Sequence, residues 1–320
     1  MKKLLKLTAL CMALLMVLGL TACSGGKKDT YVVGICQLVQ HAALDDATRG
    51  FQDALKEELG DKVTFDYQNA SNELTMCSSI VNQFVAANVD LILANATPAL
   101  QAAAAATVDI PILGTSVTEY GVALEIENFS GTVGGNISGT SDLAPLDAQA
   151  KMIQEWFPEA KTVALLYCSA EANSQYQVDV VKAELEKMGY TCAYYSFSDS
   201  NDLAAVVEGA VAACDLIYVP TDNTVAANTE IIDNICRPAG QPVIGGDGGI
   251  CSGCTVATLC IQYYDLGYAT GKMAAKILTG EAKISDMPIA YAQATSVYNP
   301  EICSALGLTP PEGYAALGAE

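Results

Sequence analysis

The 320-residue chain contains a single histidine and a single tryptophan, and it carries few basic residues. No serine or cysteine motif that would supply a nucleophile accompanies the histidine, His41. The sequence also lacks a phosphate-binding loop, a dinucleotide fingerprint and a metalloprotease helix motif. These absences argue against an enzyme, and they indicate neither a cofactor nor a metal site.

Acidic residues outnumber basic residues by 36 to 16. Three of the lysines, Lys2, Lys3 and Lys6, lie in an N-terminal segment that we expect to be removed, which brings the mature net charge to about −23. Such a surface repels polyanions, so nucleic acid and anionic lipid headgroups are disfavoured as partners.

The N-terminus has the pattern of an export signal. The three lysines precede an apolar run from Leu7 to Leu20, which is short for a membrane span, and Thr21-Ala22-Cys23 follows. We expect residues 1–22 to be a signal peptide, Cys23 to carry a lipid, and residues 23–29 to be a tether. No second apolar stretch of spanning length follows. The remainder is therefore expected to be extracytoplasmic and lipid-anchored to the cell membrane.

The twelve cysteines do not suggest a disulfide framework. Cys11 would leave with the signal and Cys23 would be lipidated, and several others, such as Cys36 and Cys168, lie within apolar runs. Cys251 and Cys254 have neither the further ligands of a zinc site nor the context of a redox motif, so we expect no functional thiol pair.

The remaining chain of about 290 residues favours two lobes, and its two halves repeat one pattern. Apolar runs in the first half are Tyr31 to Cys36, Asp90 to Thr97 and Ile110 to Ser116, and those in the second half are Thr162 to Tyr167, Asp215 to Asp222 and Gln241 to Asp247. Near-continuous apolar runs are typical of parallel strands buried on both faces. Helical spacing of apolar residues between the runs predicts an α/β fold with two doubly wound parallel-sheet lobes.

Ligands of such sheets bind beyond the carboxyl ends of the strands, so polar residues there are candidates. Thr97 with Pro98 opens a predicted helix whose free N–H groups suit a carboxylate, although a plain helix cap fits equally well. Asn173 and Ser174 occupy the equivalent turn of the second half and carry the same two interpretations. Ser116 belongs to a third strand end.

Three hydrogen-bonding residues in a row, Thr221, Asp222 and Asn223, follow another strand. Asp222 is our candidate counter-charge for a ligand ammonium, with an Asx turn as the alternative. Asp247, between pairs of glycines, suits either ligand contact or a turn. His41 stands at the entrance of the first helix and is expected to order that loop.

Five segments in order carry a resemblance to a known family. They are Gly34 to Gln37 with His41 to Asp45, Ala96 to Ala99, Glu171 to Ser174, Val219 to Asn223, and Tyr263 to Gly267. Together they resemble the substrate-binding lipoproteins of the tryptophan/tyrosine ABC-transporter family, over nearly the whole mature chain. Where the family usually has proline, this chain has Ala42.

The resemblance implies a type I periplasmic-binding-protein fold with a three-strand hinge, and delivery of an aromatic or other hydrophobic amino acid to an ABC permease and ATPase. On matching positions it implies ligand contacts from Gln37, Asp45, Thr97, Asn173, Ser174, Thr221, Asp222 and Asn223. We expect a monomer. The expected lobes are residues 30–141 with 262–288, and residues 142–261 with 289–320.

Other functions stay open at this level. A sugar or nucleoside binder of the same fold often stacks its ligand on tryptophan, but Trp156 lies at helical spacing from Ile153 and is predicted to be in the core. Arg49 and Arg237 are expected on helices. A surface adhesin or the ligand-capturing subunit of a sensor would also suit a lipid anchor. An extracytoplasmic enzyme is disfavoured by the missing catalytic groups.

Overall fold

The computed structural model describes residues 30–318. The predicted signal peptide, the predicted lipidation site Cys23 and the predicted tether lie outside this range. Within it, no helix combines the length and the apolar character that a membrane span requires.

The first lobe is built around a six-stranded sheet in the order β11-β5-β4-β3-β1-β2, in which all pairs are parallel. Its strands are β1 (Tyr31–Gln37), β2 (Val63–Asn69), β3 (Leu91–Asn95), β4 (Ile112–Val117), β5 (Ile137–Ser141) and β11 (Ala290–Tyr291). Its helices are α2 (Ala42–Leu59), α3 (Leu74–Ala87), α4 (Thr97–Ala106), α5 (Tyr120–Ala123) and α12 (Tyr263–Leu278), with 3-10 turns η1 (Gly60–Lys62) and η2 (Ile284–Asp286).

The second lobe holds a seven-stranded sheet in the order β13-β12-β10-β9-β8-β6-β7, with one antiparallel pair, β10 with β12. Its strands are β6 (Thr162–Cys168), β7 (Thr191–Phe197), β8 (Leu216–Val219), β9 (Val243–Gly245), β10 (Ala257–Cys260), β12 (Thr295–Tyr298) and β13 (Ala315–Ala316). Its helices are α6 (Leu146–Trp156), α7 (Ala172–Lys187), α8 (Ser200–Ala213), α9 (Asn223–Ala226), α10 (Thr229–Ala239), α11 (Gly248–Cys254) and α13 (Pro300–Leu306).

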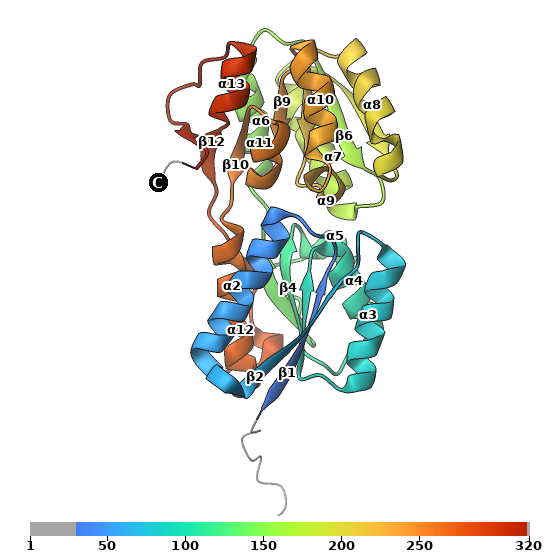
Figure 1. The fold of residues 1–320 in the computed structure, drawn as a ribbon, viewed down its shortest axis with the longest axis vertical. Helices are drawn as coiled ribbons and strands as arrows, with labels where there is room; N and C mark the ends of the chain where they lie inside the picture. The colour runs from blue at the N-terminus through green and yellow to red at the C-terminus, as the bar shows by residue number, and fades with distance from the viewer. Residues whose placement is uncertain (1–29, 319–320) are drawn as a thin grey trace, which may run out of the picture. The chain divides into compact units, whose positions relative to one another are not determined.

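The same strand order recurs in both lobes. β2-β1-β3-β4-β5 in the first sheet matches β7-β6-β8-β9-β10 in the second, and helices cover both faces of each sheet (Figure 1). A repeated aspartate supports the match, because Asp90 accepts a hydrogen bond from the Val32 amide at 2.8 Å and Asp215 accepts one from the Thr162 amide at 2.8 Å. The predicted pair of doubly wound α/β lobes is confirmed.

The chain passes between the lobes three times. It leaves the first sheet after β5, returns between β10 and α12, and leaves again after β11. The last passage differs from the expected boundary at residue 288, because β11 pairs with β5 and extends the edge of the first sheet to Tyr291.

Apolar cores lie on both faces of each sheet. Val33 and Ile35 pack toward α2 and α12, whereas Cys36 belongs to the core under α3 and α4. Trp156 is buried in the second lobe with its ring centroid 5.3 Å from that of Tyr314. The prediction that this tryptophan belongs to the core is confirmed.

All ten cysteines between residues 30 and 318 are free thiols, and eight of them are buried. The Cys251 thiol donates to the Thr255 carbonyl at 3.6 Å, and the Cys254 thiol donates to the Ile250 carbonyl at 3.6 Å. Burial raises the pKa of Cys251 to about 12. Both thiols therefore behave as small apolar side chains with local hydrogen bonds.

Candidate functional site

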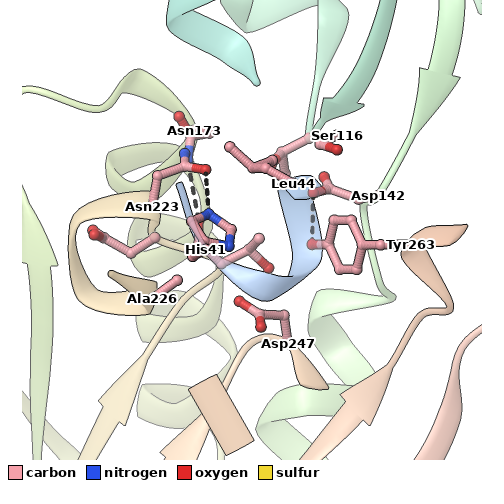
Figure 2. A pocket seen from close by; sticks show the side chains of 12 residues that line it. His41, Leu44, Ser116, Asp142, Asn173, Asn223, Ala226, Asp247 and Tyr263 are labelled. Carbon is pink, nitrogen blue, oxygen red and sulfur yellow. Dashed lines mark hydrogen bonds between the residues drawn. The ribbon is translucent and has the colours of Figure 1, made fainter. Parts of the chain in front are cut away.

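A polar cavity lies where loops of both lobes meet (Figure 2). The first lobe contributes His41, Leu44, Ser116 and Thr118, and the second contributes Asn173, Thr221, Asp222, Asn223, Ala226 and Asp247. Asp142 and Tyr263 come from the chain crossings. The free volume is about 10 Å³, which is the room of one water molecule.

The topology explains why these segments meet. In each sheet the strand order reverses between two neighbouring strands, β1 and β3 in the first lobe and β6 and β8 in the second. The loops that follow such strands diverge to opposite faces of the sheet and leave a crevice between them. His41 follows β1, Asn173 follows β6 and Asp222 follows β8. The cavity therefore lies beyond the carboxyl ends of the strands at the switch point, where doubly wound sheets usually bind their ligands.

Asp222 and Asp247 both cap short helices at the cavity. Asp222 accepts from the Val225 amide at 2.9 Å and from the Cys168 amide at 2.7 Å, and Asp247 accepts from the Ile250 amide at 2.9 Å. Burial, followed by the nearby Glu171 carboxylate, raises the pKa of Asp222. Burial raises the pKa of Asp247 to about 6. The sequence left open whether these aspartates shape a local turn or contact a ligand. In the structure each aspartate caps a helix and also lines the cavity.

Asp142 is the third carboxyl group at the cavity. The Tyr263 hydroxyl donates to its Oδ2 at 2.8 Å, and burial raises the pKa of Asp142. Sequence reasoning did not single out Asp142, and it quoted Tyr263 only as part of a resembling segment. The adjoining Leu44 and Thr118 were also missed. The signal available for Tyr263 was its place at the start of that segment.

His41 lies in the middle of the cavity (Figure 2). Its Nε2 is 3.4 Å from Oδ1 of Asn223, which belongs to the other lobe. Burial lowers the pKa of His41, so the ring is neutral near pH 7. The histidine that was expected to order a loop thus also lines the cavity and contacts the opposite lobe.

Four cavity atoms are buried without a hydrogen-bond partner among residues 30–318. They are Nδ1 of His41, Oγ of Ser116, Oδ1 of Asp142 and Oδ1 of Asn173. Each can accept a hydrogen bond when His41 is the Nε2–H tautomer and Asp142 is ionised, and the serine hydroxyl can also donate. Buried polar atoms nearly always have a hydrogen-bond partner, so this group of acceptors favours a ligand that carries several hydrogen-bond donors.

Four predicted residues do not line this cavity. Gln37 alternates with Cys36 along β1 and therefore points toward α2, where its Nε2 donates to Asp45 at 2.7 Å and its Oε1 accepts from Thr48 at 2.7 Å. Thr97 is buried in the first turn of α4. Ser174 is buried behind the cavity, where Asn173 donates to its hydroxyl at 3.3 Å. Gln37, Asp45, Thr97 and Ser174 are therefore not part of the cavity lining in this structure.

No group of three or more histidine, cysteine, aspartate or glutamate side chains within residues 30–318 is arranged to hold a metal ion. The lining includes no lysine or arginine. The cavity is therefore acidic, and its polar groups can bind and orient a ligand.

The family model described as ABC transporter substrate binding protein matches residues 32–320. The tyrosine-binding protein of Clostridioides difficile (strain R20291) is 34% identical over 277 residues, which cover 85% of this chain and 79% of that protein. Among solved structures, the ABC domain from Streptococcus pneumoniae in complex with L-Trp has a TM-score of 0.84 and 34% identity, covering 88% of this chain and 96% of that one.

A second solved structure helps to place the conformation. It is the ligand-free, open form of a substrate-binding protein with adhesive properties from Clostridium difficile, with 36% identity, a TM-score of 0.68, and coverage of 91% of this chain and all of that one. The two structures have similar identity to this chain, yet the L-Trp complex superposes much better. In the structure described here two hydrogen bonds join the lobes, His41 with Asn223 and Asn72 with Thr224. With its fold, its inter-lobe cavity and these matches, the chain belongs to the ABC transporter substrate-binding protein family.

Proposed function

We propose that this protein captures an aromatic L-amino acid, tyrosine or tryptophan, between its lobes and delivers it to an ABC permease and ATPase. It would act as a monomer outside the cytoplasmic membrane, held there by a lipid on Cys23, and it would break no bond of its ligand. In this proposal residues 30–141 with 262–291 form the first lobe, and residues 142–261 with 292–318 form the second.

The observation that carries the proposal is the set of unpartnered acceptors in the cavity. His41 Nδ1, Asp142 Oδ1 and Asn173 Oδ1 are buried and await donors. An ammonium group supplies three N–H donors and a positive charge, which offsets the cost of burying carboxylates beside one another. Asp142, Asp222 and Asp247 provide that negative charge, and the lining includes no basic residue that would compete for it.

The carboxylate of an amino acid has a separate place. Helices α2 and α7, of 18 and 16 residues, begin directly after His41 and Glu171, and neither of these two residues caps its helix with its side chain. Their first-turn N–H groups carry the positive end of the helix dipole. Leu44 and Asn173, in those first turns, line the cavity. These amides suit a carboxylate, in place of the N-terminus of α4 that the sequence suggested.

Entry of the ligand requires the lobes to separate. The free volume of about 10 Å³ holds one water molecule and excludes an aromatic ring. The ammonium and the carboxylate would each contact both lobes as the lobes close, and closure would remove water from the charged groups. The bound form then presents a surface to the permease that the open form lacks.

A thermal-shift screen tests the proposal. The purified chain is heated with each of the twenty amino acids, with glucose, galactose and inositol, and with nucleosides. A ligand at a hundred times its dissociation constant adds about 2.7 kcal/mol to the free energy of unfolding. We expect L-tyrosine or L-tryptophan to give the largest shift. A response to sugars or nucleosides alone would refute the amino-acid ligand, and a response only to other amino acids would refute the aromatic specificity.

A further inference from the structure

Glu171 makes an unusual set of contacts at the edge of the cavity. It is 3% exposed, and each of its carboxylate oxygens accepts from one backbone amide and from at least one side chain; Oε2 also accepts from Asn173 Nδ2 at 3.4 Å. Oε2 accepts from Asn223 N at 3.1 Å and from Asn223 Nδ2 at 2.6 Å. Oε1 accepts from Thr224 N at 2.9 Å and from Thr224 Oγ1 at 2.9 Å.

These contacts fix the direction of two side chains. A backbone N–H can only donate, so both oxygens of Glu171 act as acceptors. The Asn223 amide must then turn its nitrogen toward Glu171 and its oxygen away. In the same way Thr224 directs its hydroxyl proton to Glu171 and leaves its lone pairs free.

The free acceptors of both residues meet the first lobe. Asn223 Oδ1 lies 3.4 Å from Nε2 of His41, and Thr224 Oγ1 accepts from Nδ2 of Asn72 at 3.0 Å. The first lobe therefore donates and the second accepts in both of these cross-lobe hydrogen bonds. His41 can donate from Nε2 as a neutral ring only if Nδ1 carries no proton.

We propose that Glu171 is a positioning residue that sets the hydrogen-bond polarity of the ligand cavity: through Asn223 it holds His41 in the Nε2–H form, so that Nδ1 faces the cavity as an acceptor. This step rests on the side-chain geometry of the second lobe and its contact with the first. Its consequence for specificity rests on the proposed function, because an acceptor at Nδ1 favours a ligand that brings an ammonium group.

The chain's single histidine makes this testable without resonance assignment. Long-range ¹⁵N–¹H correlation spectra near pH 7.5 report which ring nitrogen is protonated, and they are recorded on the chain purified without a histidine tag, with and without saturating L-tyrosine or L-tryptophan. The wild type should show His41 as the Nε2–H form in at least one of these states. In Glu171→Gln the new side-chain NH2 group faces a backbone N–H, and two donors cannot pair. The Asn223 side chain then loses its fixed direction. The population of His41 in the Nδ1–H form should increase severalfold.

Matched variants separate positioning from damage to the fold. Glu73→Gln makes the same chemical change at an exposed position next to Asn72, and its His41 spectrum should match that of the wild type. Asn223→Ala removes the relay while Glu171 stays, and it should reproduce the Glu171→Gln spectrum even if Glu171→Gln does not fold. Thr224→Val removes the contact with Asn72 and one hydrogen bond to Oε1 of Glu171, but it keeps both Asn223 bonds to Oε2 and should leave the His41 spectrum unchanged. A wild-type Nδ1–H ring in every state, or an Asn223→Ala spectrum identical to the wild type, overturns the inference.

Ligand discrimination provides a second readout. Affinities for L-tyrosine and for 3-(4-hydroxyphenyl)propionate, which lacks the amino group, are measured for the wild type and for Glu171→Gln. The wild-type preference for L-tyrosine should fall by roughly tenfold in the variant, whereas general damage would lower both affinities equally. Equal losses would overturn the specificity step. If the wild type binds neither L-tyrosine nor L-tryptophan, the proposed function fails, and the histidine spectra still decide the role of Glu171.

Discussion

The Tyr263 hydroxyl donates a hydrogen bond to Oδ2 of Asp142 at 2.8 Å, across 121 positions of sequence. Asp142 directly follows β5 and Tyr263 opens α12, so the bond joins two of the three chain crossings. It also orients the carboxyl group, whose Oδ1 has no partner in the described part of the chain. The hinge and the cavity thus share one side-chain pair.

We therefore expect Asp142→Asn to weaken binding of L-tyrosine or L-tryptophan more than Tyr263→Phe does. The first variant replaces an acceptor for the ammonium with an amide, and a hydrogen bond to a charged group contributes about 1.5–3 kcal/mol, or roughly 10- to 100-fold in affinity. The second variant keeps the ring and the carboxylate. Isothermal titration calorimetry measures both, and a larger loss in Tyr263→Phe would contradict this assignment of Asp142.

Binding should also depend on pH through Asp247. Burial raises the pKa of Asp247 to about 6, above the ordinary aspartate value of about 4. Between these values the folded chain keeps a proton that the unfolded chain releases, so the free energy of unfolding of the ligand-free protein falls as pH rises through this window. The total loss is about 3 kcal/mol. An ammonium stabilises the charged carboxylate, so affinity for L-tyrosine should rise with pH from about 5 to about 7, by up to roughly tenfold per pH unit below the pKa.

Asp247→Asn is the matched control for this pH dependence. Asparagine can still cap α11 at the Ile250 amide, so the local fold is preserved. Burial also raises the pKa of Asp142, and burial together with the nearby Glu171 carboxylate raises the pKa of Asp222 to about 8, so these two residues keep a part of the dependence. The slope of affinity against pH should decrease in the variant, and a slope as steep as in the wild type would rule out Asp247 as the titrating group.

Thiol reactivity gives a prediction that is independent of the ligand. Cys251 and Cys254 are buried, and burial raises the pKa of Cys251 to about 12, so few thiolates form near pH 8. Cys192 and Cys214 are partly exposed. Native protein treated with iodoacetamide should be labelled slowly, and at Cys192 and Cys214 first, as peptide mapping would reveal. Rapid native labelling of Cys251 or Cys254 would restore the thiol pair as a functional candidate.

Much of the fold follows from the sequence because buried parallel strands leave near-continuous apolar runs. The repeated Asp-Leu-Ile at Asp90 and Asp215 marks equivalent strands, and the loops that follow the strands at each switch point supply the cavity. The same reasoning found Asn173, Asp222 and Asp247 because strand ends are identifiable positions in a doubly wound sheet.

The other features of the site depend on side-chain orientations and on contacts between distant segments, which the order of residues does not reveal. Gln37 ends a strand, yet side-chain alternation points it at α2 with Val33 and Ile35. Asp142 and Tyr263 lie on chain crossings, where no apolar periodicity identifies the side chains that reach the cavity. Glu171 stands in a resembling segment, but its role emerges from four hydrogen bonds to residues 52 and 53 positions away.

The contact between α2 and α12 permits a last prediction about stability. A Cβ atom at Gly267 would lie 1.9 Å from the Ala47 carbonyl oxygen, which is backbone and cannot move aside cheaply. Gly267→Ala should lower the free energy of unfolding in urea by about 3 kcal/mol, because the two helices must separate. Gly209→Ala is the control, since its nearest neighbour would be 3.8 Å away on an exposed face of α8, and the higher helix propensity of alanine should raise stability by about 1 kcal/mol. Effects of the same sign would show that helix propensity, and not the close approach of α12 to α2, governs both positions.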